Sequence, residues 1–396
     1  MDQSAVVEER LAGLLAEHPP ATTDERTFWG AQFDAGLAWV QFPEGLGGCG
    51  VSPQYQSVVD QAIVEAGGST RNRIDNVLGV GMGAGTIMAH GSEEHQRRFL
   101  RPMFTMEEIW CQLFSEPGAG SDLAALSTSA VRDDDHWIVN GQKVWTTLGH
   151  LARWGLLVAR TDPDLPKHAG LTYFLLDMEA EGVDVRPLYQ ITGEAEFNEV
   201  YLTDVAIGDD HRLGEVGQGW SVAMTTLMNE RVAIGGSVQP RGSGAIGEAV
   251  HVWQERHGAH GDPVLKDELL QLWVATEAMR LTAMRAKEAA STGTPGPEGS
   301  TGKLQWAELN KRITSFTMDL LGPEALTYPG GYRFVRPDGS ADVDGAPHKR
   351  FLRARANSIE GGTSQIMKNI LGERVLGLPG EPRVDKDRPW REVPRS

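Results

Sequence analysis

The chain has 396 residues, of which 40% are hydrophobic, so it can bury a sizeable core and form more than one domain. Its formal net charge of −17 argues against nucleic-acid and anionic-membrane partners, because both attract basic surfaces. Two cysteines, Cys49 and Cys111, are too few for a disulfide framework and fit a cytoplasmic protein. The sequence shows no signal segment and no apolar run long enough for membrane insertion.

Residues 1–109 have the pattern of a helical region. Apolar residues recur at helical spacing between residues 6 and 15. Ser52 followed by Pro53 predicts the start of a helix, since these residues favour the cap and the first helical position. Ser92, which precedes two glutamates, predicts a second capped start.

Residues 110–218 have the pattern of short strands. Asn140-Gly141 lies between the segments 136–139 and 142–145, which contain β-branched and aromatic residues, and this dipeptide favours tight hairpin turns. We therefore predict a hairpin there. Further short apolar or alternating runs at close spacing predict a small barrel or sandwich.

From Gly219 onward the pattern is helical again. We predict one long helix from Trp220 to Gln254, a second that begins at Pro263, and further helices that complete a bundle. The sequence thus divides into a helical domain at 1–109, a middle β domain at 110–218, a helical bundle at 219–379 and an extended tail at 380–396.

Two polar, glycine-rich stretches stand about 240 residues apart, at 114–122 and 358–366. Gly118 and Gly120 would let backbone N–H groups approach a phosphate closely, which is a frequent purpose of such loops. The histidines are scattered, and no cluster of metal ligands is visible in the sequence.

Together, several stretches resemble the acyl-CoA dehydrogenase family over most of the chain, and in particular its members in actinobacterial lipid and sterol catabolism. These stretches are residues 110–122, 140–147, 228–233, 362–365 and 372–379. The resemblance implies an α+β fold with an N-terminal helical domain, a central small β-barrel or sandwich and a C-terminal four-helix bundle.

The same resemblance implies a flavoprotein oxidoreductase of fatty acid β-oxidation type. A glutamate would take the α-proton of an acyl-CoA thioester, and FAD would accept the β-hydride at N5. Electrons would then pass to an electron-transfer flavoprotein. The family is commonly a homodimer or homotetramer, and a heteromer with a paralogue is also open.

The resemblance carries over a set of cofactor-binding positions. In the family these residues lie along the isoalloxazine, near the pyrophosphate or at the start of the C-terminal helix, and one reaches the FAD of a neighbouring subunit. The set is Leu113, Ser115, Gly120, Ser121, Trp145, Thr147, Arg256, Thr363 and Gln365. The neighbour-reaching segment corresponds to residues 320–326, which here lack the usual glutamine-rich, double-glycine pattern.

The catalytic base requires a separate argument. Where most of the family has a glutamate before Gly-Thr, this chain has Gly361, whose N–H can still polarise the thioester carbonyl. Glu230 matches the helix position that a minority of the family uses, directly before an arginine, here Arg231. Glu360 is the second candidate, and a chain with no working base is the third possibility. Ser121, Arg231, Glu360 and Gly361 are the expected substrate contacts.

Two other functions stay open on the sequence. The chain could be a non-catalytic or co-catalytic subunit of a heteromeric acyl-CoA dehydrogenase, since Gly361 removes the common base. It could also be a flavin oxidase or monooxygenase on the same fold, because a fold alone does not decide the reaction.

Overall fold

The computed structural model of the protein describes residues 2–235, 238–291, 298–329, 331, 334–339, 345–380, 382 and 385–394. Within these ranges, the side chains of residues 230–235, 259, 289–291 and 298–299 are outside the description.

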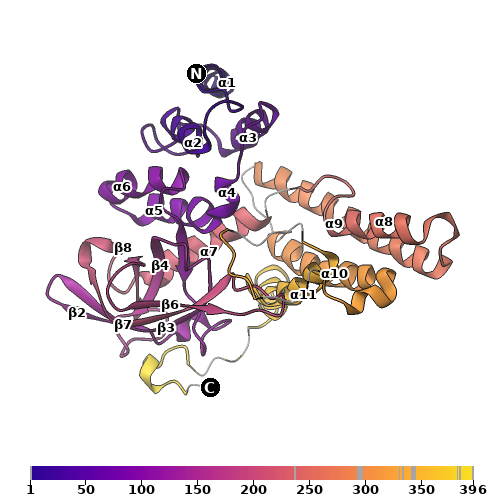
Figure 1. Ribbon diagram of the computed structural model, residues 1–396. Helices are drawn as coiled ribbons and strands as arrows, with labels where there is room; N and C mark the ends of the chain where they lie inside the picture. Colours follow the sequence, from indigo (N-terminus) through magenta and orange to yellow (C-terminus); the bar gives the residue numbers. More distant parts are fainter. Residues whose placement is uncertain are drawn as a thin grey trace.

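The N-terminal part is helical and packs against the sheet (Figure 1). Its helices are α1 (Gln3–Glu17), α2 (Glu25–Asp34), α3 (Gln56–Glu65), α4 (Asn72–Asp75), the π-helical turn η2 (Leu78–Gly83), α5 (Ala84–His90) and α6 (Glu93–Phe104). Ser92 caps α6 as predicted, because its Oγ accepts a hydrogen bond from His95 N at 3.2 Å. Ser52 makes no such side-chain bond, and the predicted helix opens with a 3₁₀ turn at Pro53–Tyr55.

The middle part is a mixed sheet with the order β6-β7-β3-β2-β4-β5-β8, and β1 pairs in parallel with β4. Its strands are β1 (Trp110–Leu113), β2 (Ser129–Asp133), β3 (His136–Thr147), β4 (Trp154–Arg160), β5 (Leu171–Asp177), β6 (Val183–Leu188), β7 (Phe197–Gly208) and β8 (Arg212–Leu213). The two halves of the sheet enclose a core, in which the rings of Trp137 and Phe174 lie 5.5 Å apart.

The predicted hairpin at Asn140-Gly141 is wrong, because β3 runs through both residues without turning. The turn lies earlier, between β2 and β3, where Asp134 has a φ of 52°. Gly141 instead allows β3 to pack closely against Thr128, because a Cβ at position 141 would come within 2.4 Å of Thr128 Oγ1. Asn140 lies at an irregularity in the β3–β7 register, and its Nδ2 donates to Asp204 Oδ1 at 2.9 Å.

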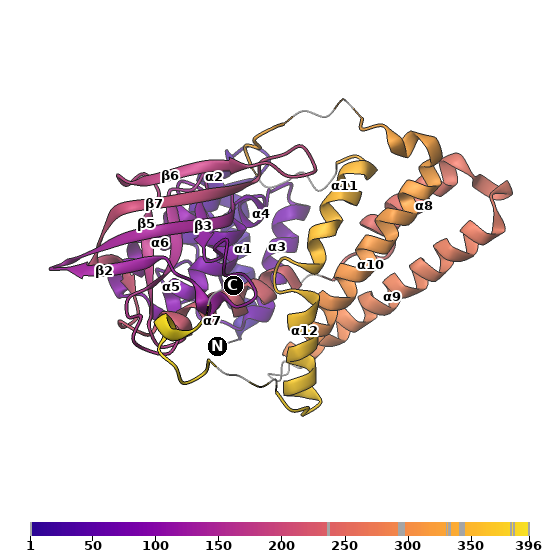
Figure 2. The same cartoon turned by 90° about the horizontal axis from the view of Figure 1, so that it is seen from below.

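The C-terminal part is a helical bundle, and α10 contacts α8, α9, α11 and α12 (Figure 2). Its helices are α7 (Gly219–Gly235), α8 (Ala245–Arg256), α9 (Pro263–Ser291), α10 (Glu298–Leu321), α11 (Pro347–Ala354) and α12 (Ser364–Ile370). The single helix predicted from Trp220 to Gln254 is therefore wrong: α7 ends at Gly235, and Gly242 and Gly244, both with positive φ, precede α8. Left-handed backbone cannot continue a helix.

This order of helices, sheet and helices confirms the expected α+β architecture. The exact domain boundaries proposed from the sequence stay a prediction. In the part of the chain that the structure describes, no helix combines the length and apolar character needed to cross a membrane. The described residues also contain no group of three or more metal-ligating side chains that could hold an ion.

Candidate cofactor and substrate site

The two motifs at 113–122 and 140–147 are joined by the buried side chain of Lys143 on β3. Its Nζ donates hydrogen bonds to the carbonyl oxygens of Phe114 and Val158 at 3.1 and 2.9 Å. It also donates to Glu116 Oε1 at 2.8 Å, and the two side chains are only 0% and 5% exposed. Three donors therefore meet three acceptors, as a buried ammonium requires.

Glu116 is held equally firmly from its other side. Its Oε2 accepts from the backbone N and the Oγ of Ser127 at 2.7 and 2.9 Å, and its Oε1 accepts from Thr128 N at 2.9 Å. One residue earlier, the Ser115 carbonyl accepts from Val144 N at 2.9 Å. The start of the glycine-rich loop is thus fixed to β2 and β3 by buried charge and by the backbone.

The ionised form of Glu116 should make stability dependent on pH in the acid range. Burial alone would raise the pKa of Glu116, but the charge and hydrogen bond of Lys143, with the donors on Thr128 and Ser127, lower it from 4.5 to about 2. A pKa lower in the folded than in the unfolded chain gives stability that is present above about pH 4.5 and is lost as pH falls toward 2. Thermal midpoints measured from pH 6 to 3 should show this fall, which amounts to roughly 3 kcal/mol at its limit.

The control for the acid dependence is Glu116→Gln, which has no carboxyl to titrate at this position. It should be less stable than the unmodified protein at neutral pH and should have a flatter slope between pH 4.5 and 3. Equal slopes in the two proteins would show that Glu116 is not the titrating group.

The tip of this loop is open. Gly118, Gly120 and Ser121 are exposed, and a Cβ built on either glycine meets nothing within 4 Å. Neither glycine has a left-handed φ, so the backbone conformation does not require glycine here. The small size of the two residues instead leaves the backbone accessible to a ligand. Below the tip, Glu116 and Ala119 exchange two backbone hydrogen bonds of 3.0 Å, which form a rigid turn.

Trp145 is an outlier in backbone and in exposure. It has a φ of 61° at a bulge where the β3–β7 register shifts between Lys143 and Thr146. Its side chain is 58% exposed, and its ring makes an edge contact with Phe197 at 5.8 Å. A left-handed backbone is costly for a bulky residue and is frequent at functional sites. The adjoining Thr147 is half-buried and pairs with Phe197 in the sheet.

Phe197 connects Trp145 to the second polar stretch, near residue 360. The guanidinium of Arg353 lies 5.7 Å from the Phe197 ring centroid and forms an ion pair with Glu360 at 2.8 Å. Asn357 Nδ2 donates to the same carboxylate at 2.8 Å. The structure therefore links two predicted site residues, Trp145 and Glu360, through two residues that were not predicted, and the Glu360 carboxylate is engaged by both Arg353 and Asn357.

The turn after Glu360 has a fixed backbone. Gly361 and Gly362 have φ angles of 60° and 90°, which favour glycine at both positions. Lys303 Nζ donates to the Gly362 carbonyl at 2.5 Å. Thr363 then caps α12, since its Oγ1 accepts from Ile366 N at 3.1 Å.

Three further predicted cofactor residues have different surroundings. Leu113 is fully buried in the sheet core, so only its backbone is available to a ligand. Gln365 is exposed in the first turn of α12. Arg256 forms a bidentate ion pair with Glu324 at 2.6 and 2.5 Å. This pair joins Arg256 to the segment 320–326, and both were expected to reach the FAD of a neighbouring subunit.

The side chains of Glu230 and Arg231 lie outside the described residues, although their backbone is part of α7. The preceding turns of α7 are firmly packed. Thr226 Oγ1 lies 3.0 Å from the Tyr173 hydroxyl on β5, and Asn229 Nδ2 donates to the Met82 carbonyl at 3.3 Å. The backbone at Glu230 thus continues directly from a segment held between the sheet and η2.

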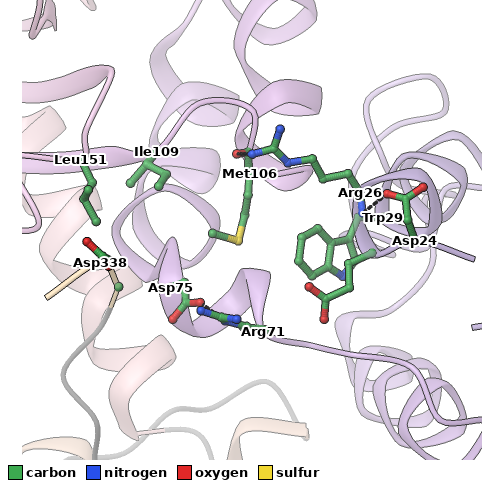
Figure 3. Close-up of a pocket in the computed structure, with 11 residues that line it drawn as sticks. Asp24, Arg26, Trp29, Arg71, Asp75, Met106, Ile109, Leu151 and Asp338 are labelled. Atoms are coloured by element: carbon green, nitrogen blue, oxygen red, sulfur yellow. Dashed lines mark hydrogen bonds and ion pairs between the residues drawn. The ribbon is translucent and has the colours of Figure 1, made fainter. Parts of the chain in front are cut away.

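A hollow of about 380 Å³ lies elsewhere, between the N-terminal helices and the loops near residues 109, 151 and 338 (Figure 3). It is lined by Asp24, Glu25, Arg26, Trp29, Arg71, Asp75, Met106, Ile109, Leu151, Asp338 and Gly339. None of the predicted site residues lines it, so it is not the predicted site.

Sequence reasoning missed the roles of Lys143, Glu116, Phe197 and Arg353. A signal for the first two was present, because each is a charged residue inside a motif that carries the family resemblance. Phe197 and Arg353 carried no comparable signal, since their importance comes only from contacts between β7 and α11.

Sequence models of the N-terminal, middle and C-terminal domains of acyl-CoA dehydrogenase match residues 3–107, 111–205 and 217–376. The chain belongs to the acyl-CoA dehydrogenase family. Among its relatives, acyl-CoA dehydrogenase IpdE1 of Mycobacterium tuberculosis is 36% identical over 383 residues, which cover 94% of this chain and 92% of that protein.

Solved structures agree with this assignment. The ChsE4-ChsE5 complex from Mycobacterium tuberculosis is 26% identical, with a TM-score of 0.72, and the match covers 96% of this chain and 98% of that one. A glutaryl-CoA dehydrogenase from Mycobacterium smegmatis in complex with FADH2 shares the fold at 19% identity, with a TM-score of 0.69, over 97% of this chain and 96% of that one. The expected actinobacterial type of acyl-CoA dehydrogenase is confirmed.

As a member of this family, the chain carries out flavin-dependent dehydrogenation of an acyl-CoA, and its cofactor is FAD. The described residues fit that cofactor. The open tip at Gly118 and Gly120 leaves room for a pyrophosphate, and Trp145 presents a large aromatic ring from a strained backbone.

Proposed function

We propose that the enzyme removes the α-proton of an acyl-CoA thioester with Glu230 while the β-hydride leaves to the flavin. When bound, FAD supplies the hydride acceptor, and an electron-transfer flavoprotein is its proposed oxidant. Loss of one proton from Cα and one hydride from Cβ turns the single bond between them into a double bond. The charge of the acyl group does not change, because a proton and a hydride carry opposite charges. Arg231 is the proposed cation for the CoA portion.

Glu230 is favoured over Glu360 as the base by the contacts of Glu360. A general base needs a free carboxylate within hydrogen-bond reach of its proton. The carboxylate of Glu360 instead pairs with Arg353 at 2.8 Å and accepts from Asn357 at 2.8 Å. We assign Glu360 the role of holding the Gly361 turn, so that the Gly361 N–H polarises the thioester carbonyl.

Cofactor binding divides among three proposed regions. The N–H groups near Gly120 and the Ser121 hydroxyl would hold the pyrophosphate, because small exposed residues allow close approach. The backbone of Leu113, the Ser115 hydroxyl, Trp145 and Thr147 would contact the isoalloxazine. Thr363 and Gln365 would contribute at the start of α12.

The observation that carries this proposal is the link from Trp145 through Phe197 and Arg353 to Glu360, because it joins the motif at 140–147 to the polar stretch at 358–366, far apart in the sequence. The test is an anaerobic titration of the FAD-loaded enzyme with acyl-CoA thioesters of different chain length, branching and bulk. Bleaching of the visible flavin band by one class supports the dehydrogenase and names its substrate. Retention of the band with every thioester would contradict it and favour a subunit that needs a paralogue, and rapid reoxidation by air would favour an oxidase.

Trp145→Ala should weaken FAD binding about tenfold, which corresponds to about 1.4 kcal/mol. The thermal midpoint of the FAD-free protein should change little, because the ring is 58% exposed and contributes little to the core. Titration of FAD into the apoprotein, followed by flavin fluorescence, measures both proteins. Trp306→Ala, which removes a 38% exposed ring on α10, is the matched control and should leave FAD affinity unchanged.

We propose that the enzyme self-associates, with Arg256 near the FAD of the neighbouring copy. Helix α9 presents several exposed apolar residues, which favours contact with a second copy. They are Val264, Leu270, Val274, Leu281 and Met284. The molar mass of the FAD-loaded protein in solution distinguishes a homo-oligomer from a monomer that awaits a paralogue.

A further inference from the structure

The C-terminal segment 385–394 returns to the β domain and packs beside the glycine-rich loop. Figure 1 shows this segment next to the sheet, and Figure 2 shows it apart from α12. Its backbone pairs with the loop after β4: Trp390 N donates to the Leu165 carbonyl at 2.9 Å, and Arg391 N donates to the Pro163 carbonyl at 3.1 Å.

Trp390 is the buried anchor of this segment, with 8% of its surface exposed. Its Nε1 donates to the Ala125 carbonyl at 3.1 Å, directly at the end of the glycine-rich loop. The guanidinium of Arg160 lies 4.4 Å from the centroid of its ring, within the range of a cation–π contact.

Arg160 carries this contact into the loop. Its guanidinium donates to the Ala124 carbonyl at 2.6 Å, to the Leu126 carbonyl at 3.2 Å and to the Lys167 carbonyl at 3.1 Å. The Arg160 side chain is buried beneath Trp390. The indole ring therefore covers the guanidinium that holds the backbone of residues 124–126.

A second connection reaches closer to the tip of the loop. Lys167 Nζ donates to both carboxylate oxygens of Asp122 at 2.9 and 2.8 Å, and to Asp385 on the C-terminal segment at 2.5 Å. Only 12% of the Lys167 side chain is exposed. Asp122 adjoins Ser121, so this bridge ties the C-terminal segment to the open tip.

We propose that the C-terminal segment 385–394 is a positioning element for the pyrophosphate loop of FAD, with Trp390 as its anchor. This inference rests on the proposed role of residues 118–121 in binding the pyrophosphate. Glu116 holds the first end of the loop, and the segment holds the second end through Ala125, Arg160 and Lys167. A loop fixed at both ends keeps its N–H groups oriented before the ligand arrives, which reduces the ordering cost of binding.

The test compares FAD affinity of full-length variants, measured by flavin fluorescence during titration of the apoproteins. Trp390→Ala should raise the Kd for FAD about tenfold, and Trp390→Phe, which keeps a ring over Arg160 but loses the hydrogen bond to Ala125, should raise it less. Asp385→Asn should raise it in the same direction by weakening the bridge to Lys167. Arg391 lies in the same C-terminal segment and forms an exposed ion pair with Asp164. Arg391→Ala removes this ion pair and should leave the Kd for FAD unchanged.

A second readout separates positioning from general stability. Amide hydrogen exchange in the apoproteins should accelerate at residues 117–126 in Trp390→Ala and stay unchanged in α9 and α10. An FAD affinity within twofold of the unmodified protein in both Trp390→Ala and Asp385→Asn would overturn the inference. If Trp390→Ala does not fold, Asp385→Asn decides alone. Failure of the proposed function itself would differ, because the unmodified protein would then not bleach with any acyl-CoA whatever its FAD affinity.

Discussion

Glu230→Gln is expected to lower the turnover number about 10²- to 10⁴-fold while FAD binding stays intact, because it removes the proton acceptor and keeps the shape of the side chain. An acyl-CoA α-proton is weakly acidic, so loss of the base should affect the chemical step more than substrate binding. The measurement is the rate of flavin bleaching in a rapid anaerobic mixing experiment with a saturating acyl-CoA. The substrate dissociation constant is taken from the concentration dependence of the same rates.

Glu360→Gln is the matched control, since it makes the same chemical change in the other candidate. It weakens the contact with Arg353 and should disturb the Gly361 turn, so a moderate loss is expected, well below that of Glu230→Gln. If Glu360→Gln instead abolishes bleaching and Glu230→Gln does not, the assignment of the base is wrong. If neither substitution slows bleaching, neither glutamate is the base.

Lys143→Met is expected to destabilise the enzyme by on the order of 3–5 kcal/mol, because it leaves the carboxylate of Glu116 buried without its cation. The two side chains are 0% and 5% exposed, so water cannot replace the lost partner. The loop that begins at Glu116 should loosen as well, and FAD affinity should fall with it. Denaturant unfolding of the FAD-free protein measures the stability, and FAD titration measures the consequence for the site.

The double variant Lys143→Met with Glu116→Gln tests the charge explanation. It removes both charges, so it should recover part of the stability lost in the single variant. Lys311→Met is the control for loss of a lysine in a more exposed ion pair, here with Glu308, and should change stability by less than about 1 kcal/mol. A single variant Lys143→Met as stable as the unmodified protein would show that the pair contributes little.

Local signals in the sequence predicted several elements correctly. The cap at Ser92 and the helix start at Pro263 each depend on neighbouring residues only, and the structure has both. The prediction of a hairpin at Asn140-Gly141 was wrong because the glycine is there for close packing and not for a turn. Gly141 lies against Thr128, and this close approach is a property of the folded sheet.

The candidate site was predicted unevenly for the same reason. Motif resemblance indicated the loop at 113–122 and the turn at 361–365, because their glycines and hydroxyl residues appear as runs in the sequence. It did not indicate the partners of Glu116 and Glu360. Their partners, Lys143 and Arg353, are separated from them by 27 and 7 residues and meet them only through the fold.

By itself, the sequence determined the family, the order of helical and strand regions, and the cofactor class. It also showed that position 361 has no glutamate. All of these follow from local residue patterns and from the order of the motifs along the chain. Only the tertiary structure decided which charged groups meet. It buried Lys143 against Glu116, paired Glu360 with Arg353, and seated Trp390 over Arg160 beside the glycine-rich loop. Such contacts depend on how the chain is folded in space, and the free energy of burying a charge is defined only when its neighbours in space are known.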